Sequence, residues 1–145
     1  MNRAQKIAWF TLIMLMLALS LSLIAVCMLH FGFGLPMRRA VAGFGFISIM
    51  GLSGLASLLF KKDKGKVKLD ERDLIIKNKA KLVAYWSFWP IFVLAAMVPF
   101  FIYGPDGNVS VLYLCWMVFG GMFLVMLIES ITILQEYGWR SNKNE

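Results

Sequence analysis

A short charged stretch, Asp70-Glu71-Arg72-Asp73, holds the densest group of side chains that could do chemistry, and it stands just before a long apolar run. Three carboxylates this close could bind a divalent cation or dock a basic partner. Cation binding, however, needs further oxygen ligands that converge from elsewhere in the chain, and five lysines lie in the nine positions before Asp70. We therefore expect no metal here and keep protein docking as the functional alternative.

The same stretch has the pattern of a helix start. Asp70 is a favourable N-cap, and Asp73 occupies the N3 position, where a carboxylate compensates the exposed amides of a helix N-terminus. Asp73 and Lys77 are four residues apart, in the favourable order for a helical ion pair. We predict a short amphipathic cytoplasmic helix that begins near Asp70 and continues into the third apolar run, with Pro90 as a kink.

Glu129 is the single acidic residue within the last apolar run. An ionisable group inside a membrane is costly, and it suggests a function by default. Twenty residues separate it from the start of the run at Val109, which brings it close to the inner interface. We expect a structural pair with a cytoplasmic lysine or contact with headgroup water. Partner contact and a proton- or ion-coupled role remain as alternatives.

A run of lysines precedes the acidic stretch and is too polar to pack into a core. We expect it to contact anionic lipid headgroups, where each base near the surface adds about 1 kcal/mol. We expect no nucleic-acid partner, because no aromatic residues interleave with these bases and no nucleic-acid-binding motif is present. The candidate lipid contacts are Lys61, Lys62, Lys64, Lys66 and Lys68.

The remaining reactive side chains form no constellation. His30 has no second histidine to join it, and Cys27 and Cys115 lie in apolar runs without a C-x-x-C pair. An intramembrane enzyme would need convergent His, Asp, Glu or Cys groups at one depth. We therefore expect no catalytic residues, no metal and no cofactor, and we do not expect an enzyme.

The elements that must position these residues follow from the composition. Of the 145 residues, 60% are hydrophobic and only 16% are charged, whereas soluble domains average about 45–50% apolar and about 25% charged residues. Four apolar runs are each long enough to cross a hydrocarbon core of about 30 Å as a helix. We predict an all-α integral membrane protein with transmembrane helices at 7–30, 40–60, 82–103 and 109–134.

Basic residues set the expected orientation of these helices. Thirteen of the fifteen lysines and arginines fall in the N-terminal tail, the central connection and the C-terminal tail, and Arg38 and Arg39 are the exceptions. The positive-inside rule then places both termini in the cytoplasm, and we expect a multi-pass protein of the plasma membrane. The remaining predicted segments are a tail at 1–6, an outer loop at 31–39, a basic cytoplasmic loop and amphipathic helix at 61–81, an outer turn at 104–108 and a tail at 135–145.

Small residues at a spacing of four mark the expected helix contacts, because they let helix backbones approach closely. They occur as Ala18-x-x-x-Ser22 in the first run and as Ser53-x-x-x-Ser57 in the second, which is also rich in glycine. We expect these patterns to serve packing within the chain, with homo-oligomerisation as the alternative.

The charged stretch also carries a resemblance to a known family. Asp70-Glu71-Arg72-Asp73, followed by Ile76, Lys79 and Ala80 before a span, resembles the D-E-R-D motif of small prokaryotic predicted membrane proteins. The segment from Glu129 to Arg140 is similar to the family ending and departs from it at Glu136 and Trp139. The resemblance implies two helices on each side of the motif and no assigned activity. It singles out Asp70, Glu71, Arg72 and Glu129.

Two classes of function are consistent with these features. We predict an interaction module or an accessory or regulatory subunit, because a charged cytoplasmic loop stands on a bundle with few polar groups inside. The alternative is an oligomeric small-molecule or ion transporter or channel subunit, for which Glu129 is the candidate acid. The expected partners are the lipid bilayer and either another membrane protein or further copies of the chain. Asp70, Glu71 and Arg72 should form a contact surface close to Glu129 and the C-terminal tail.

Overall fold

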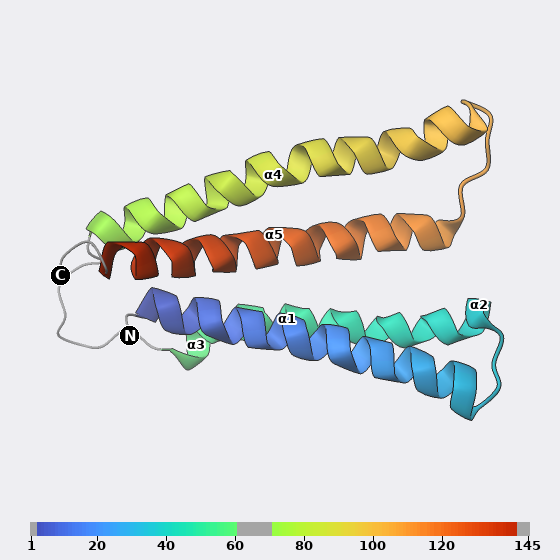
Figure 1. Cartoon of the computed structure of the whole chain (residues 1–145), viewed down its shortest axis with the longest axis horizontal. Coiled ribbons are helices and arrows are strands. Elements are labelled where there is room, and N and C mark those ends of the chain that lie inside the picture. Colours follow the sequence, from blue (N-terminus) through green and yellow to red (C-terminus); the bar gives the residue numbers. More distant parts are fainter. Residues whose placement is uncertain (1–2, 61–70, 142–145) are drawn as a thin grey trace. The chain divides into compact units, whose positions relative to one another are not determined.

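The computed structural model describes residues 3–60 and 71–141, and these residues are almost entirely helical. The chain divides into two compact units, Met1–Lys64 and Gly65–Glu145. Each unit is a hairpin of two long helical arms joined by a short turn, as Figure 1 shows. No strand occurs among the described residues, and the predicted all-helical class is confirmed.

The first unit begins with a long α-helix and returns along a composite arm. α1, Arg3–Cys27, continues directly into a π-helical stretch, η1, Met28–Gly32. Gly34 then turns the chain with a φ of +64°, a left-handed conformation that glycine adopts without strain. The second arm consists of three consecutive segments: α2, Met37–Ala40; η2, Val41–Leu55; and α3, Ala56–Leu59.

This second arm differs from the α-helix that we expected over residues 40–60. Its central segment, η2, is a 3-10 helix of 15 residues, although such helices are usually short. η2 contains four glycines, and each disfavours an α-helix by about 1 kcal/mol relative to alanine. In a 3-10 helix the residues i and i+3 stand in line, so η2 presents one narrow ridge to its neighbour. The glycines are Gly43, Gly45, Gly51 and Gly54.

The packing of α1 against η2 follows the periods of the two kinds of helix. Buried positions of the second arm recur every three residues, at Ile47, Met50, Ser53 and Ala56. Those of α1 recur at intervals of three and four, at Leu15, Ala18, Ser22 and Val26. Ala18, Ser22 and Ser53 therefore serve packing within the chain, as their spacing predicted. Ser57 lies outside the described side chains.

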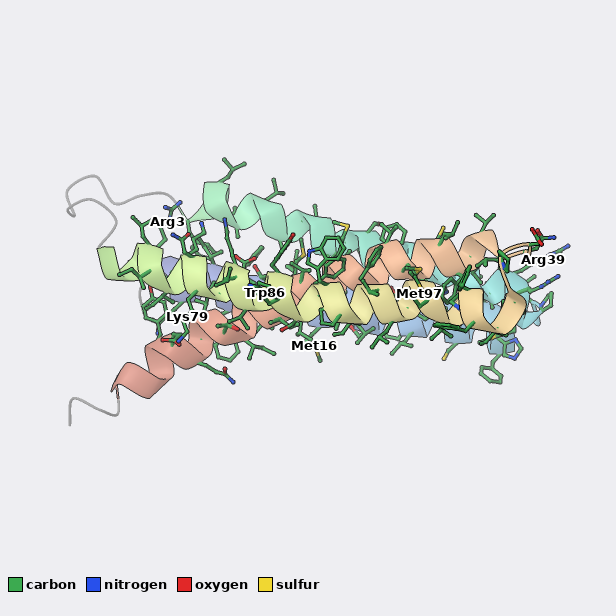
Figure 2. The ribbon with its side chains drawn as sticks, turned by 90° about the horizontal axis from the view of Figure 1, so that it is seen from above. Arg3, Met16, Arg39, Lys79, Trp86 and Met97 are labelled. Atoms are coloured by element: carbon green, nitrogen blue, oxygen red, sulfur yellow. The ribbon has the colours of Figure 1, made fainter. Side chains whose placement is uncertain are left out.

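The end of the first unit opposite its turn is closed by a cation. Arg3 Nε donates a hydrogen bond to the Phe60 carbonyl at 2.6 Å, and the Phe10 and Phe60 rings meet edge to face at 6.0 Å. A basic side chain near a helix C-terminus satisfies a carbonyl that has no partner within the helix. Figure 2 shows Arg3 and Arg39 at opposite ends of this unit.

The second unit consists of two long α-helices. α4, Glu71–Tyr103, is continuous through the charged stretch and the third apolar run, and it contains Pro90 and Pro99. α5, Val111–Ser141, forms the return arm and extends beyond the predicted end at 134. Between them, Gly104 adopts a φ of +74°. Gly107 approaches the end of α4 so closely that an added Cβ would lie 2.3 Å from the Tyr103 Cβ.

Three helices among the described residues are long and apolar enough to cross a membrane, namely Arg3–Gly32, Asp73–Tyr103 and Val111–Gly138. These correspond to the first, third and fourth runs of the sequence. The second arm of the first unit is not among them, because its longest segment has 15 residues.

Candidate functional site

Polar side chains from the start of α4 and the end of α5 meet at the end of the second unit that lies opposite its turn. The Tyr137 hydroxyl donates a hydrogen bond to the Asp73 carboxylate, and Lys79 Nζ donates to Glu136 Oε1 at 2.5 Å. Figure 2 shows Lys79 on α4 beside the last turns of α5. We refer to Asp73, Lys79, Glu136 and Tyr137 as the polar cluster.

Small and apolar side chains of the two helices position this cluster. Ile76, Ala80 and Ala84 are buried on α4 at intervals of four, which places them on one side of the helix. Ser130 and Ile133 are buried on α5. Alanine and serine let helix backbones approach closely, so the longer polar side chains at the borders of this contact can reach across to the other helix.

The electrostatic strength of the cluster is modest. The side chain of Lys79 is 57% exposed and that of Glu136 is 23% exposed, and an ion pair this open contributes about 0–1 kcal/mol. The hydrogen bond from the Tyr137 hydroxyl to Asp73 joins the same two helices beside this ion pair. The buried contact of small and apolar residues therefore holds the beginning of α4 against the end of α5, and the cluster shows which polar side chains meet at its border.

Glu129 lies near the polar cluster in sequence but is not part of it. Its side chain is half-buried, and it makes no hydrogen bond or ion pair with any residue that the structure describes. Glu129 and Glu136 are seven residues apart, so they share one side of α5 and are about 10.5 Å apart along its axis. The predicted pair between Glu129 and a lysine is therefore not formed within the described part of the chain.

The structure describes the predicted contact surface only in part. Asp73 is described, and it bonds to Tyr137, whereas Lys77 makes no ion pair with the described residues. Glu71 and Arg72 belong to the first turn of α4, but their side chains lie outside the described part. The other predicted residues also lie outside the described residues, namely Asp70, Lys61, Lys62, Lys64, Lys66 and Lys68.

Sequence reasoning did not assign Lys79, Glu136 or Tyr137 to a site. Lys79 and Glu136 are 57 residues apart, and Asp73 and Tyr137 are 64 apart. The sequence feature that could have found these pairs is the short turn between the last two apolar runs. In an antiparallel hairpin, a residue a given number of positions before the turn lies opposite a residue about the same number of positions after it. The described residues contain no group of three or more His, Cys, Asp or Glu side chains that could together hold a metal ion.

Two apolar grooves lie along the middle of the same hairpin. Their cavity volumes are about 390 and 240 Å³, and Phe88, Phe92, Met117 and Gly121 border both. Gly121 allows the contact between the helices here, since an added Cβ would lie 2.8 Å from Phe88 Cε2. The larger groove continues along α5 past Met122 and Met126. Flexible methionine side chains can adapt such a surface to varied apolar groups.

Long apolar helices with polar groups gathered near their ends define a helical membrane protein. The chain belongs to the family described as Predicted membrane protein (DUF2178), whose sequence model matches residues 2–132. The resemblance seen in the sequence is confirmed at this level, because the family comprises predicted membrane proteins of unknown function. No curated protein and no solved structure matched the chain.

Proposed function

We propose that the chain crosses the plasma membrane four times with both termini in the cytoplasm. The first, third and fourth crossings would be the three long helices, and the second would be the arm from Met37 to Leu59. That arm has 23 residues, and 3-10 helix rises about 2.0 Å per residue, so its length of roughly 40 Å is sufficient. The distribution of basic residues supports the orientation.

Within this topology, we propose that the protein is an interaction module or an accessory or regulatory subunit of a membrane assembly rather than an enzyme. The observation that carries the proposal is the polar cluster. Where the start of α4 meets the end of α5 at this cluster, the stretch 70–73 would come close to the C-terminal tail. We take the stretch 70–73 to be the D-E-R-D motif of the family. Together with the tail, it would form one cytoplasmic contact surface for a partner.

The test is purification of the tagged full chain from its native membrane in mild detergent, with identification of stoichiometric companions by mass spectrometry. We compare the wild-type chain with Glu71→Lys, which reverses one charge on the proposed surface. The matched control is Asp106→Lys, which makes the same charge change in the exposed turn between α4 and α5. We expect a companion protein that is lost with Glu71→Lys and retained with Asp106→Lys.

Either of two results would reject the accessory-subunit proposal. One is a homogeneous preparation that contains only copies of this chain. The other is a companion that both variants retain equally, since the stretch 70–73 would then have no part in its recognition. Equal yield and equal elution on size exclusion establish that the variants are folded before the companions are compared.

Glu129 favours a second candidate function, an oligomeric small-molecule or ion transporter or channel subunit. Its half-buried carboxylate has no partner among the described residues, so it could bind a proton or a cation. Glu129→Gln removes the charge and keeps the shape of the side chain. A loss of ion-coupled flux in proteoliposomes, with the oligomer intact, would support this function, and unchanged flux would exclude a role of Glu129 in it.

A further inference from the structure

We infer that the second unit carries a binding site for one anionic phospholipid, with its headgroup on Lys77 and Lys81 and an acyl chain in the larger groove between α4 and α5. This site is separate from the five lysines of the central loop. It also does not depend on the accessory-subunit proposal, because a lipid could occupy it whether or not a partner protein binds.

The cationic part of the site consists of two exposed lysines on one face of α4. Lys77 and Lys81 are four residues apart, so their side chains lie on the same side of the helix on successive turns. Neither makes a hydrogen bond or an ion pair with any described residue. Lys79 points to a different side of the helix, where it pairs with Glu136. The two remaining ammonium groups are therefore available to one phosphate.

An aromatic strip continues this face into the apolar part of α4. The residues Lys77, Lys81, Tyr85, Phe88 and Phe92 follow one another at intervals of four, four, three and four, which is the spacing of a single helix face. The Tyr85 ring meets that of Trp89 edge to face at 6.0 Å, and the Phe88 and Phe92 rings are 5.1 Å apart. Tyrosine and tryptophan favour the level of the lipid headgroups, which fits the position of Tyr85 between the lysines and the phenylalanines.

The strip leads into the larger groove. Phe88 and Phe92 form its border on α4, and Met117, Val118 and Met122 are among its residues on α5. About 390 Å³ of space lies between these apolar side chains. Phe88 is seven residues from Lys81, so the groove begins about 10.5 Å further along the helix axis. An acyl chain that descends from a phosphate held at Lys77 and Lys81 would reach it.

Charge complementarity decides the kind of occupant. This face of α4 begins with two lysines that have no partner among the described residues, and it continues into the apolar groove. The matching molecule therefore has an anionic head and a hydrocarbon tail. Basic sites on the cytoplasmic side of transmembrane helices bind anionic lipid headgroups for this reason. A soluble phosphate would leave the groove unfilled, and a zwitterionic lipid would offset the attraction with its own cation.

Native mass spectrometry of the full chain tests the site, with phosphatidylglycerol and phosphatidylcholine of identical acyl chains as probes. We expect tighter retention of phosphatidylglycerol by the wild-type chain. The double variant Lys77→Gln/Lys81→Gln should bind it about thirtyfold more weakly, since each base near an anionic headgroup contributes roughly a factor of five. The control Arg38→Gln/Arg39→Gln makes the same change in net charge in the other unit, at two exposed positions, and should leave the affinity unchanged.

A second pair of variants tests the groove without changing charge. Val118→Trp should fill the groove and weaken phosphatidylglycerol binding, whereas Leu114→Trp should not, because Leu114 borders neither groove and is exposed to a similar extent, 54% against 57%. Equal affinity for the two lipids would overturn the proposal. So would an equal loss in both double-lysine and double-arginine variants, or an unaffected affinity in Val118→Trp. Helical content by circular dichroism confirms that each variant is folded.

Discussion

One hydroxyl group replaces a backbone hydrogen bond that a proline removes from α4. Pro99 has no N–H, so the carbonyl four residues earlier, that of Ala95, loses its usual donor within α4. The Tyr113 hydroxyl of α5 donates a hydrogen bond to this carbonyl instead. In a lipid environment, water cannot supply the missing donor, which makes a substitute from a neighbouring helix valuable. A helix-breaking residue thus creates a specific contact between the two arms.

At this scale we predict that Tyr113→Phe destabilises the second unit by about 1 kcal/mol, the usual size of a hydrogen bond between membrane helices. The effect should disappear in a Pro99→Ala background, since alanine at position 99 restores the N–H donor to the Ala95 carbonyl. Thermal unfolding of the purified chain in detergent measures both changes as a double-mutant cycle. Equal losses in the two backgrounds would show that the hydroxyl acts elsewhere.

At the scale of elements, one glycine decides how closely α1 and η2 pack. An added Cβ at Gly43 would lie 2.8 Å from the Val26 nitrogen and 3.0 Å from the Ala25 carbonyl carbon. Both are backbone atoms, so they cannot move aside as a flexible side chain could. Gly45 stands two residues further along η2, and nothing lies within 4 Å of its added Cβ. The two glycines thus have different roles in the same helix.

We therefore predict that Gly43→Ala lowers the free energy of unfolding by about 1–3 kcal/mol, the cost of overpacking a well-filled contact. Gly45→Ala should be neutral or stabilise the chain by up to about 1 kcal/mol, because it only restricts the unfolded state. Unfolding in increasing denaturing detergent compares the two variants directly. A similar loss for both would mean that backbone flexibility, and not close packing, is what glycine provides here.

At the scale of the whole molecule, the proposed topology predicts which sites reagents can reach from outside the cell. In a chain with Cys27→Ser and Cys115→Ser, a thiol at Asp106→Cys should react with a membrane-impermeant maleimide in intact cells, because the turn would lie outside. A thiol at Asn142→Cys should react only after the membrane is permeabilised. The reverse pattern would invert the orientation, and reaction of both in intact cells would show that α5 does not cross the membrane.

The sequence predicted most of the helices, but it did not predict which side chains of different helices are in contact. The apolar runs indicated helices of spanning length, and three such helices are present. The 3-10 geometry of η2 was not predicted, because it depends on how a glycine-rich arm packs against α1. For Asp73 the nearest sequence partner was Lys77, four residues away, but its carboxylate accepts a bond from Tyr137 in the other arm. The local spacing thus favoured an ion pair between Asp73 and Lys77, whereas the contact that forms is the hydrogen bond from Tyr137.

The sequence by itself determined that this is a helical membrane protein, because long runs of apolar residues leave helices as the way to satisfy their backbone groups in lipid. Only the tertiary structure decided which side chains meet. Lys79 and Glu136, like Pro99 and Tyr113, come together through the register of two antiparallel helices. That register is set by the fit of small residues such as Ala80 and Gly121 into the opposite helix, a property of two surfaces together.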